Sequence, residues 1–329
     1  MKTKDEKKFK LSICIISFNA LDYLKKCLTS VYASHEDIEF EVIVVDNNSK
    51  EDNVGYIKKN FPQIKLIANQ ENNYFAAGNN QAFAVASGEY ILLLNPDAEV
   101  ISGSLTKMVQ YLDKNKKIGV LGPKLLNSDG TLQGSISNYL TILDLIKEYT
   151  FYFKIERVIK KNPSQYSYTH FVDSMLGACL LVRKTVIDEV GPLDEFFKFY
   201  AEEVDFLFRV KEKKWKICFY PEVSIYHHSN KCAGQNKLRR VSSLEENLKS
   251  QYRFIRKHRK YIETFLAKLL LILVLYLRMI SRLIISFITR KKDLELFKAR
   301  INSYKRTIFW LLSEADKEKM GVYAHYIKK

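Results

Sequence analysis

Three apolar segments in the first hundred residues each end in polar or acidic side chains. The segments, with the polar residues at their ends, are 11–17 with Ser17 and Asn19, 40–45 with Asp46 and Asn48, and 91–94 with Asn95 and Asp97. Between Gly88 and Pro96 four apolar residues follow one another, so this segment cannot alternate between core and solvent. Such a pattern is typical of a strand buried on both faces. We therefore predict three strands with polar carboxyl ends.

Helical patterns follow these strands along the chain. Apolar residues recur every three or four positions from Leu21 to Val31, and a second helical pattern after Gly78 precedes the third strand. Alternation of strands and helices predicts an α/β fold with a mostly parallel central sheet and helices on both faces. Ligands bind outside the carboxyl ends of such strands. We therefore expect the polar strand ends to form one site along one edge of the sheet.

Four motifs in this half of the chain, and a fifth further on, occur in an order that resembles a known family. They are Ile16-Ser17-Phe18-Asn19, residues 44–49 (VVDNNS), residues 72–80 (NNYFAAGNN), residues 93–97 (LLNPD) and residues 199–209 (FYAEEVDFLFR). Together they resemble the family-2 inverting glycosyltransferases of the GT-A fold, in particular the rhamnosyltransferase-like branch. The resemblance covers roughly residues 10–230.

The resemblance and the composition suggest a division of the chain. We expect a charged N-terminal tail at residues 1–9 and a GT-A domain at 10–230, followed by a basic and apolar helical extension at 231–329. Within the GT-A domain, residues 10–100 would form the nucleotide-sugar half and residues 101–230 the acceptor and catalytic half.

A nucleotide sugar carries a diphosphate, and the sequence offers neither of the glycine-rich phosphate loops, Gly-x-Gly-x-x-Gly or the P-loop. A divalent cation can hold the diphosphate instead, because Mg²⁺ and Mn²⁺ prefer oxygen ligands and share phosphates with one or two carboxylates. In the resemblance Asp97 matches the metal carboxylate of an Asp-x-Asp motif, whereas Asn95 departs from that motif in charge. The alternative for Asp97 is a turn or N-cap residue before a helix near Ser102.

The resemblance also implies how the nucleotide is bound. Asp46 matches the residue that accepts the imide N–H of uracil or thymine, although an Asx-turn at the strand end would use the same carboxylate. Gly78 and Asn79 would supply backbone amides to the donor, or would simply begin a helix. The full set predicted to bind the nucleotide sugar is Ser17, Asn19, Asp46, Asn48, Gly78, Asn79 and Asn95.

The fifth motif places three acids within four positions at a predicted helix start: Glu202, Glu203 and Asp205. The helix dipole alone favours negative charge there, by about 0.3–1 kcal/mol for each acid. An inverting transfer, however, needs a carboxylate that takes the proton of the acceptor hydroxyl. In the resemblance Glu203 matches that base, with Glu202 and Asp205 as alternatives. Two histidines then end a strand and should face opposite sides; we assign His228, rather than His227, to the metal.

The five cysteines form no Cys-x-x-Cys pair, which favours a reducing compartment over a disulfide framework. The charged N-terminus lacks an apolar segment behind it, which argues against a secretory signal.

The formal net charge is +16, with the excess of basic residues concentrated late in the chain, and residues 265–288 are mostly apolar. Because Lys268, Arg278 and Arg282 interrupt that segment, we expect a helix lying in the interface of an anionic membrane. A spanning helix and a helix that packs in solution, including in a homodimer, are the alternatives.

The resemblance, together with these observations, implies an enzyme that uses Mg²⁺ or Mn²⁺ to transfer one sugar, rhamnose or another hexose, from a dTDP- or UDP-sugar to a lipid-linked glycan. It would work as a peripheral protein on the cytoplasmic face of the membrane. A processive synthase is disfavoured because the Gln-x-x-Arg-Trp signature is absent. Nucleic-acid binding would leave the apolar segment without a role. A membrane-bound carbohydrate-binding or scaffold protein without turnover remains the non-enzyme alternative.

Overall fold

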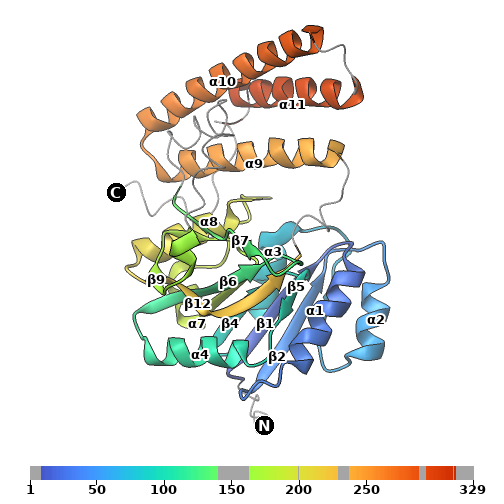
Figure 1. Ribbon diagram of the computed structural model, residues 1–329, viewed down its shortest axis with the longest axis vertical. Coiled ribbons are helices and arrows are strands. Elements are labelled where there is room, and N and C mark those ends of the chain that lie inside the picture. Colours follow the sequence, from blue (N-terminus) through green and yellow to red (C-terminus); the bar gives the residue numbers. More distant parts are fainter. Residues whose placement is uncertain are drawn as a thin grey trace, which may run out of the picture. The chain divides into compact units, whose positions relative to one another are not determined.

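The computed structural model in Figure 1 describes residues 9–139, 163–198, 200–228, 237–288, 294–313 and 315, which fall into two compact units. The first unit contains the described residues of 9–139, 163–195 and 202–228, and the second contains those of 196–201 and of the C-terminal helices. Residues 1–8 of the predicted tail and parts of the predicted extension lie outside the described residues.

A mixed sheet forms the centre of the first unit. Its long strands are β1 (Leu11–Ser17), β2 (Phe40–Asp46), β3 (Lys65–Ala68), β4 (Tyr90–Leu94), β5 (Ala98–Val100), β6 (Ile118–Leu126), β11 (Cys179–Arg183) and β12 (Lys216–His227). The order is β3-β2-β1-β4-β11-β6-β12-β5, with β7 (Leu132–Gln133) beside β6 and β9 (His170–Phe171) beside β12. Strands β1 to β4 run parallel, and β11 runs antiparallel between β4 and β6. A separate pair joins β8 (Ile136–Ser137) and β10 (Ser174–Met175).

Helices cover both faces of this sheet, as the sequence predicts. They are α1 (Leu21–Ala33), α2 (Asn53–Asn60), α3 (Tyr74–Val85), α4 (Ser104–Lys114), α7 (Lys184–Val190) and α8 (Glu202–Glu212). One hydrophobic cluster joins β1 to α1, α2 and α4, and a second joins the opposite face of β1 to α3, α7 and α8. All five residues of β4 are buried, as expected for a strand covered on both faces.

The strand register places the carboxyl ends of β1, β2 and β4 at one edge. Ser17 lies opposite Asp46, and Ile15 lies opposite Leu94. The same edge receives the turn before β11, because Cys179 pairs with Leu94 and the Ala178 carbonyl accepts the Asn95 N–H at 2.9 Å. Polar strand ends from the first half of the chain therefore meet a turn from the second half.

The second unit contains three long helices: α9 (Lys237–His258), α10 (Tyr261–Ile288) and α11 (Leu294–Ser313), which pack on one another. Ala267, Leu271 and Leu275 on α10 are buried in this packing. The eleven exposed residues between Tyr261 and Ile284 are all aliphatic or aromatic. Within the described residues, the segment Tyr261–Ile284 has the length and apolar composition needed to cross a membrane, with a mean hydropathy of 2.0 and 28% of its most apolar stretch buried.

Candidate active site

Asp46 closes a hydrogen-bonded turn at the end of β2. Its Oδ1 accepts from the Ser49 hydroxyl at 2.7 Å and from Asn53 Nδ2 at 2.8 Å, and its Oδ2 accepts from the Ser49 N–H at 3.0 Å. Asn53 Nδ2 also lies 3.0 Å from Ser17 Oγ, which ties the ends of β1 and β2 together. The turn predicted as the alternative is therefore present. Since Oδ2 accepts a single bond within the described residues, it retains a lone pair for a base N–H.

Two of the predicted asparagines shape the loops that follow these strands. Asn19 and Asn48 adopt left-handed backbone conformations, with φ of 51° and 61°. Asn19 Oδ1 accepts from the Lys50 N–H at 2.8 Å, and Asn48 Nδ2 donates to the Gln70 carbonyl at 2.8 Å. Asn47, which the sequence analysis did not select, donates to the Tyr74 carbonyl at 3.0 Å and so links the same loop to α3.

Gly78 and Asn79 lie inside α3 rather than at its start. A Cβ on Gly78 would lie 2.8 Å from Ile16 Cγ2, so the glycine allows α3 to approach β1 closely. The buried Asn79 donates from Nδ2 to the Phe75 carbonyl at 2.9 Å, within its own helix. Both residues thus have a packing role, and their predicted contact with a donor remains a prediction.

Asp97 lies in the turn between β4 and β5. Because β5 separates it from α4, Asp97 is not the N-cap of that helix, and of the predicted alternatives the turn is the one present. His227 Nε2 lies 3.3 Å from Asp97 Oδ1 and 3.3 Å from Asn95 Nδ2, and all three groups belong to buried or half-buried residues. A carboxylate oxygen and an imidazole nitrogen that face the same space can ligate a divalent cation. The described residues contain no cluster of three or more histidine, cysteine, aspartate or glutamate side chains suited to a metal. Two protein ligands suffice only where substrate phosphates and water complete the shell.

The two histidines at the end of β12 have different partners. The His228 ring lies 2.8 Å from Glu99 Oε1 through Nε2 and 2.7 Å from Ser128 Oγ through Nδ1. We assigned the metal to His228, but the geometry favours His227, because β12 pairs with β5 so that His227 lies opposite Ala98, the neighbour of Asp97. Successive side chains of a strand point to opposite sides, so only one of the two can face Asp97.

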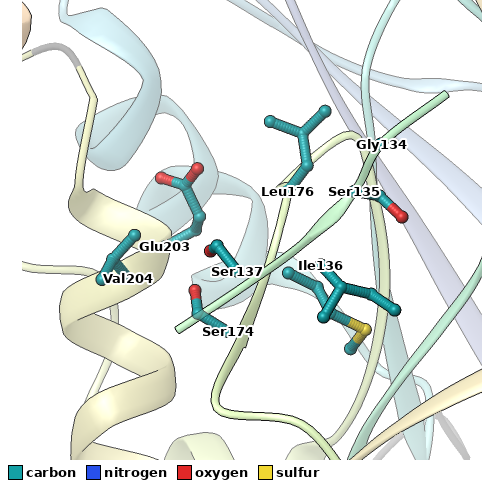
Figure 2. A pocket seen from close by; sticks show the side chains of 9 residues that line it. Gly134, Ser135, Ile136, Ser137, Ser174, Leu176, Glu203 and Val204 are labelled. Atoms are coloured by element: carbon teal, nitrogen blue, oxygen red, sulfur yellow. The ribbon is translucent and has the colours of Figure 1, made fainter. Parts of the chain in front are cut away.

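Glu203 lies in the first turn of α8 and borders a small pocket of about 170 Å³ in the first unit, shown in Figure 2. Gly177, in the turn before β11, packs against it: a Cβ on this glycine would lie 3.4 Å from Glu203 Cβ. In Figure 2 the Ser137 and Ser174 hydroxyls lie side by side and point towards α8. Burial raises the pKa of Glu203, and backbone N–H groups, including that of Gly177, offset part of this rise.

The other two acids of the motif have different surroundings. Glu202 is 7% exposed, and its pKa is raised well above the ordinary range. Burial is the larger cause of this rise, and the charge of Glu203 is the smaller one. Asp205 is fully buried and accepts from Arg209 Nε at 2.9 Å. Arg209 in turn donates to the carbonyls of Val190 and Pro192. Asp205 therefore anchors α8 to the loop after α7, whereas Glu203 lines the pocket.

One short segment connects the histidine to the pocket. Gln133 Oε1 lies 2.7 Å from His227 Nδ1, and the next residues, Gly134 to Ser137, line the pocket beside Glu203. The Ser135 carbonyl also accepts the Leu176 N–H at 2.8 Å. Gln133 is a site residue that the sequence analysis missed, because a single glutamine in a strand of two residues gives no periodic signal.

Comparison with known proteins identifies the family of the chain. The family described as Glycosyl transferase family 2 matches residues 12–177, about half of the chain. An N-acetylglucosaminyl-diphospho-decaprenol L-rhamnosyltransferase of Mycobacterium tuberculosis is 23% identical over 74% of this chain and 83% of its own length. The rhamnosyltransferase WbbL of Escherichia coli is 23% identical over 75% of this chain and 93% of its own. The chain spans only 25% and 17% of two longer relatives.

The crystal structure of GalNAc-T7 with UDP, GalNAc and Mn²⁺ matches the fold with a TM-score of 0.54 at 14% identity, over 95% of this chain and 57% of that one. This likeness confirms the predicted GT-A type of fold. With the match to residues 12–177, it identifies the class: the chain is a glycosyltransferase and belongs to glycosyl transferase family 2.

Proposed function

We propose that this chain transfers a single sugar from a nucleotide-diphosphate sugar to a glycan hydroxyl, with inversion at the sugar C1 and with a divalent cation. One observation supports the proposal above all: the Asp97–His227 pair and the pocket of Glu203 belong to the same sheet edge. Glu203 packs on Gly177, and the adjacent Ala178 carbonyl accepts the N–H of Asn95, two residues before Asp97. A donor-phosphate site and a general base are thereby joined through a few residues.

The donor would lie along the carboxyl ends of β1, β2 and β4. Asp46 Oδ2 would accept the imide N–H of a uracil or thymine ring, and Ser17, Asn19 and Asn48 would hold the loops around it. Asp97 and His227 fit Mg²⁺ or Mn²⁺, because their facing oxygen and nitrogen atoms lie 3.3 Å apart. The cation, when bound, would neutralise charge on the leaving diphosphate.

The acceptor hydroxyl would approach through the pocket that Glu203 borders. Its carboxylate would take the hydroxyl proton as the oxygen attacks C1 from the face opposite the nucleotide, which inverts the configuration. The pocket volume of about 170 Å³ is below the roughly 300–1,000 Å³ of drug-sized pockets. This size suits one sugar ring. The polar Ser137 and the apolar Ile136 and Leu176 match a ring's hydroxyls and C–H face.

The names of two relatives support a substrate class. The mycobacterial relative is named for rhamnosyl transfer to a decaprenol-diphosphate-linked sugar, and a Campylobacter jejuni relative for glucosyl transfer to an undecaprenol-diphosphate-linked glycan. We therefore propose a lipid-linked glycan as the acceptor, and a dTDP- or UDP-linked rhamnose or other hexose as the donor.

The test is a screen of dTDP- and UDP-sugars against the full-length protein with and without Mn²⁺. We expect one donor to raise the melting temperature only with Mn²⁺, because a ligand that binds the folded state stabilises it. The same donor should be hydrolysed slowly without acceptor and consumed faster with a polyprenyl-diphosphate sugar. A donor that stabilises the protein but is never turned over would favour the non-enzyme alternative.

The charge and the exposed apolar residues of the second unit support a location at the cytoplasmic surface of a membrane. The described residues of α9, α10 and α11 carry 14 Lys and Arg against 4 Asp and Glu. The exposed side of α10 is apolar from Tyr261 to Ile284, whereas Lys268, Arg278 and Arg282 are half-buried, and Arg282 donates from Nε to the Tyr304 hydroxyl of α11 at 3.0 Å. A helix with one exposed apolar face in a strongly basic unit fits the surface of an anionic bilayer. Its opposite side packs against protein, which disfavours a lipid-surrounded span.

Replacing Leu273 and Leu277 by glutamate should therefore release the protein from anionic vesicles, since both side chains are more than half exposed. Sedimentation with phosphatidylglycerol vesicles would measure the loss, with Leu244→Glu, an equally exposed leucine on α9, as the matched control. High salt should weaken but not abolish wild-type binding, because screening leaves apolar burial intact. Resistance to alkaline carbonate would instead indicate a span, and a stable dimer without vesicle binding would indicate that a second copy covers α10.

A further inference from the structure

Gln133 contacts the one nitrogen of His227 that does not face Asp97. Its Oε1 lies 2.7 Å from Nδ1, and its side chain is 8% exposed. At the other side of the ring, Nε2 lies 3.3 Å from both Asp97 Oδ1 and Asn95 Nδ2. The imidazole is thus held between a neutral amide and the acidic turn after β4.

The hydrogen-bond network fixes which way this amide points. Gln133 Nε2 donates to the His227 carbonyl at 3.2 Å and to Asn127 Oδ1 at 3.0 Å. Asn127 itself donates from Nδ2 to the Leu132 carbonyl, which can only accept, and to the Thr131 hydroxyl. A flipped Gln133 would place its oxygen against two acceptors. Its Oε1 therefore faces His227, and Nδ1 must carry a proton to donate to it.

In the neutral ring, a proton on Nδ1 leaves the Nε2 lone pair directed at the space beside Asp97 and Asn95. Ligating histidines commonly donate their second ring N–H to a carbonyl or carboxylate, which sets the tautomer and the ring orientation. We infer that Gln133 is a positioning residue that holds His227 with Nε2 towards Asp97, ready for a divalent cation. This inference rests on the proposed metal role of His227, but Gln133 would touch neither metal nor substrate.

The test compares Gln133→Leu with Gln133→Glu. Leucine removes the acceptor for Nδ1, so Mn²⁺ binding in the presence of UDP or dTDP should weaken by about 10–100-fold, the usual loss for such partners. Glutamate keeps an acceptor for Nδ1 but loses the two bonds that Gln133 Nε2 donates, so Mn²⁺ should bind more tightly than in the leucine variant and less tightly than in the wild type. Electron paramagnetic resonance of free Mn²⁺ measures the affinity. Ser128→Ala, which removes the equivalent partner of His228, is the matched control and should leave the affinity unchanged.

A second readout does not depend on metal. The ¹⁵N shifts of His227, assigned by comparison with His227→Gln, should show the Nδ1–H tautomer in the wild type and in Gln133→Glu, and its loss in Gln133→Leu. An unchanged tautomer or an unchanged Mn²⁺ affinity in the leucine variant would overturn the inference. If the wild type binds no Mn²⁺ with either nucleotide, the proposed metal dependence fails, and the tautomer comparison still decides the role of Gln133.

Discussion

Glu203→Gln is expected to lower sugar transfer by about 10²–10⁴-fold, the usual contribution of a general base, while the affinity for the donor stays near the wild-type value. Glutamine keeps the shape of the side chain beside Gly177 but cannot accept the hydroxyl proton. Steady-state kinetics with the lipid-linked acceptor would measure the loss in kcat, and calorimetry with the unreactive nucleoside diphosphate would measure donor binding.

Glu202→Gln is the matched control, because it removes the neighbouring carboxylate of the same helix turn. Since the base must be ionised to act, and burial raises the pKa of Glu203, activity should rise with pH through a value above the ordinary glutamate range. The Glu202→Gln variant should keep this rise and most of its turnover. If Glu202→Gln is instead the variant that binds donor without turnover, the base lies one position earlier than we propose.

Asp97→Asn should remove most metal-dependent activity, to below a tenth of the wild-type rate at saturating Mn²⁺. The substitution preserves the size of the side chain in the turn after β4 but takes away the anion that faces His227 at 3.3 Å. A tenfold loss corresponds to only about 1.4 kcal/mol, so a smaller effect would be incompatible with a direct metal ligand. Initial rates across a Mn²⁺ titration are the measurement.

The matched control for this variant is Glu99→Gln, two residues along the chain. Glu99 contacts His228 at 2.8 Å, so this variant disturbs the other histidine of the pair. We expect Glu99→Gln to retain its response to Mn²⁺. Equal losses in both variants would mean that the turn and β5 respond as a structural unit, and Asp97 would then lose its assignment as a ligand.

The sequence predicted the sheet edge because that information is local. An apolar run without alternation identifies a buried strand such as β4, and a carboxylate directly after it must lie at the strand's end. The parallel arrangement of β1, β2 and β4 then follows from strand–helix alternation. The sequence alone therefore predicts that Ser17, Asp46 and Asp97 lie at one edge of the sheet.

The remaining features of the site depend on contacts between distant segments. The choice between His227 and His228 is set by the pairing of β12 with β5, and neither segment reveals this pairing in its own sequence. Gln133 reaches His227 across 94 residues of sequence, from a strand of two residues. The packing role of Gly78 was also hidden, because a glycine that lets α3 approach β1 looks, in sequence, like one that admits a ligand.

The reversed direction of β11 has a consequence for how such enzymes diversify. Because β11 runs against β4, its preceding turn lies at the edge where β4 ends: the Ala178 carbonyl accepts the Asn95 N–H, and Gly177 packs on Glu203. Ile136, Ser137 and Leu176, which line the pocket, lie on short segments outside the turns after β1 and β2. If the pocket holds the acceptor, as we propose, grafting residues 134–137 and 174–176 from a relative should change acceptor preference and leave donor choice unchanged.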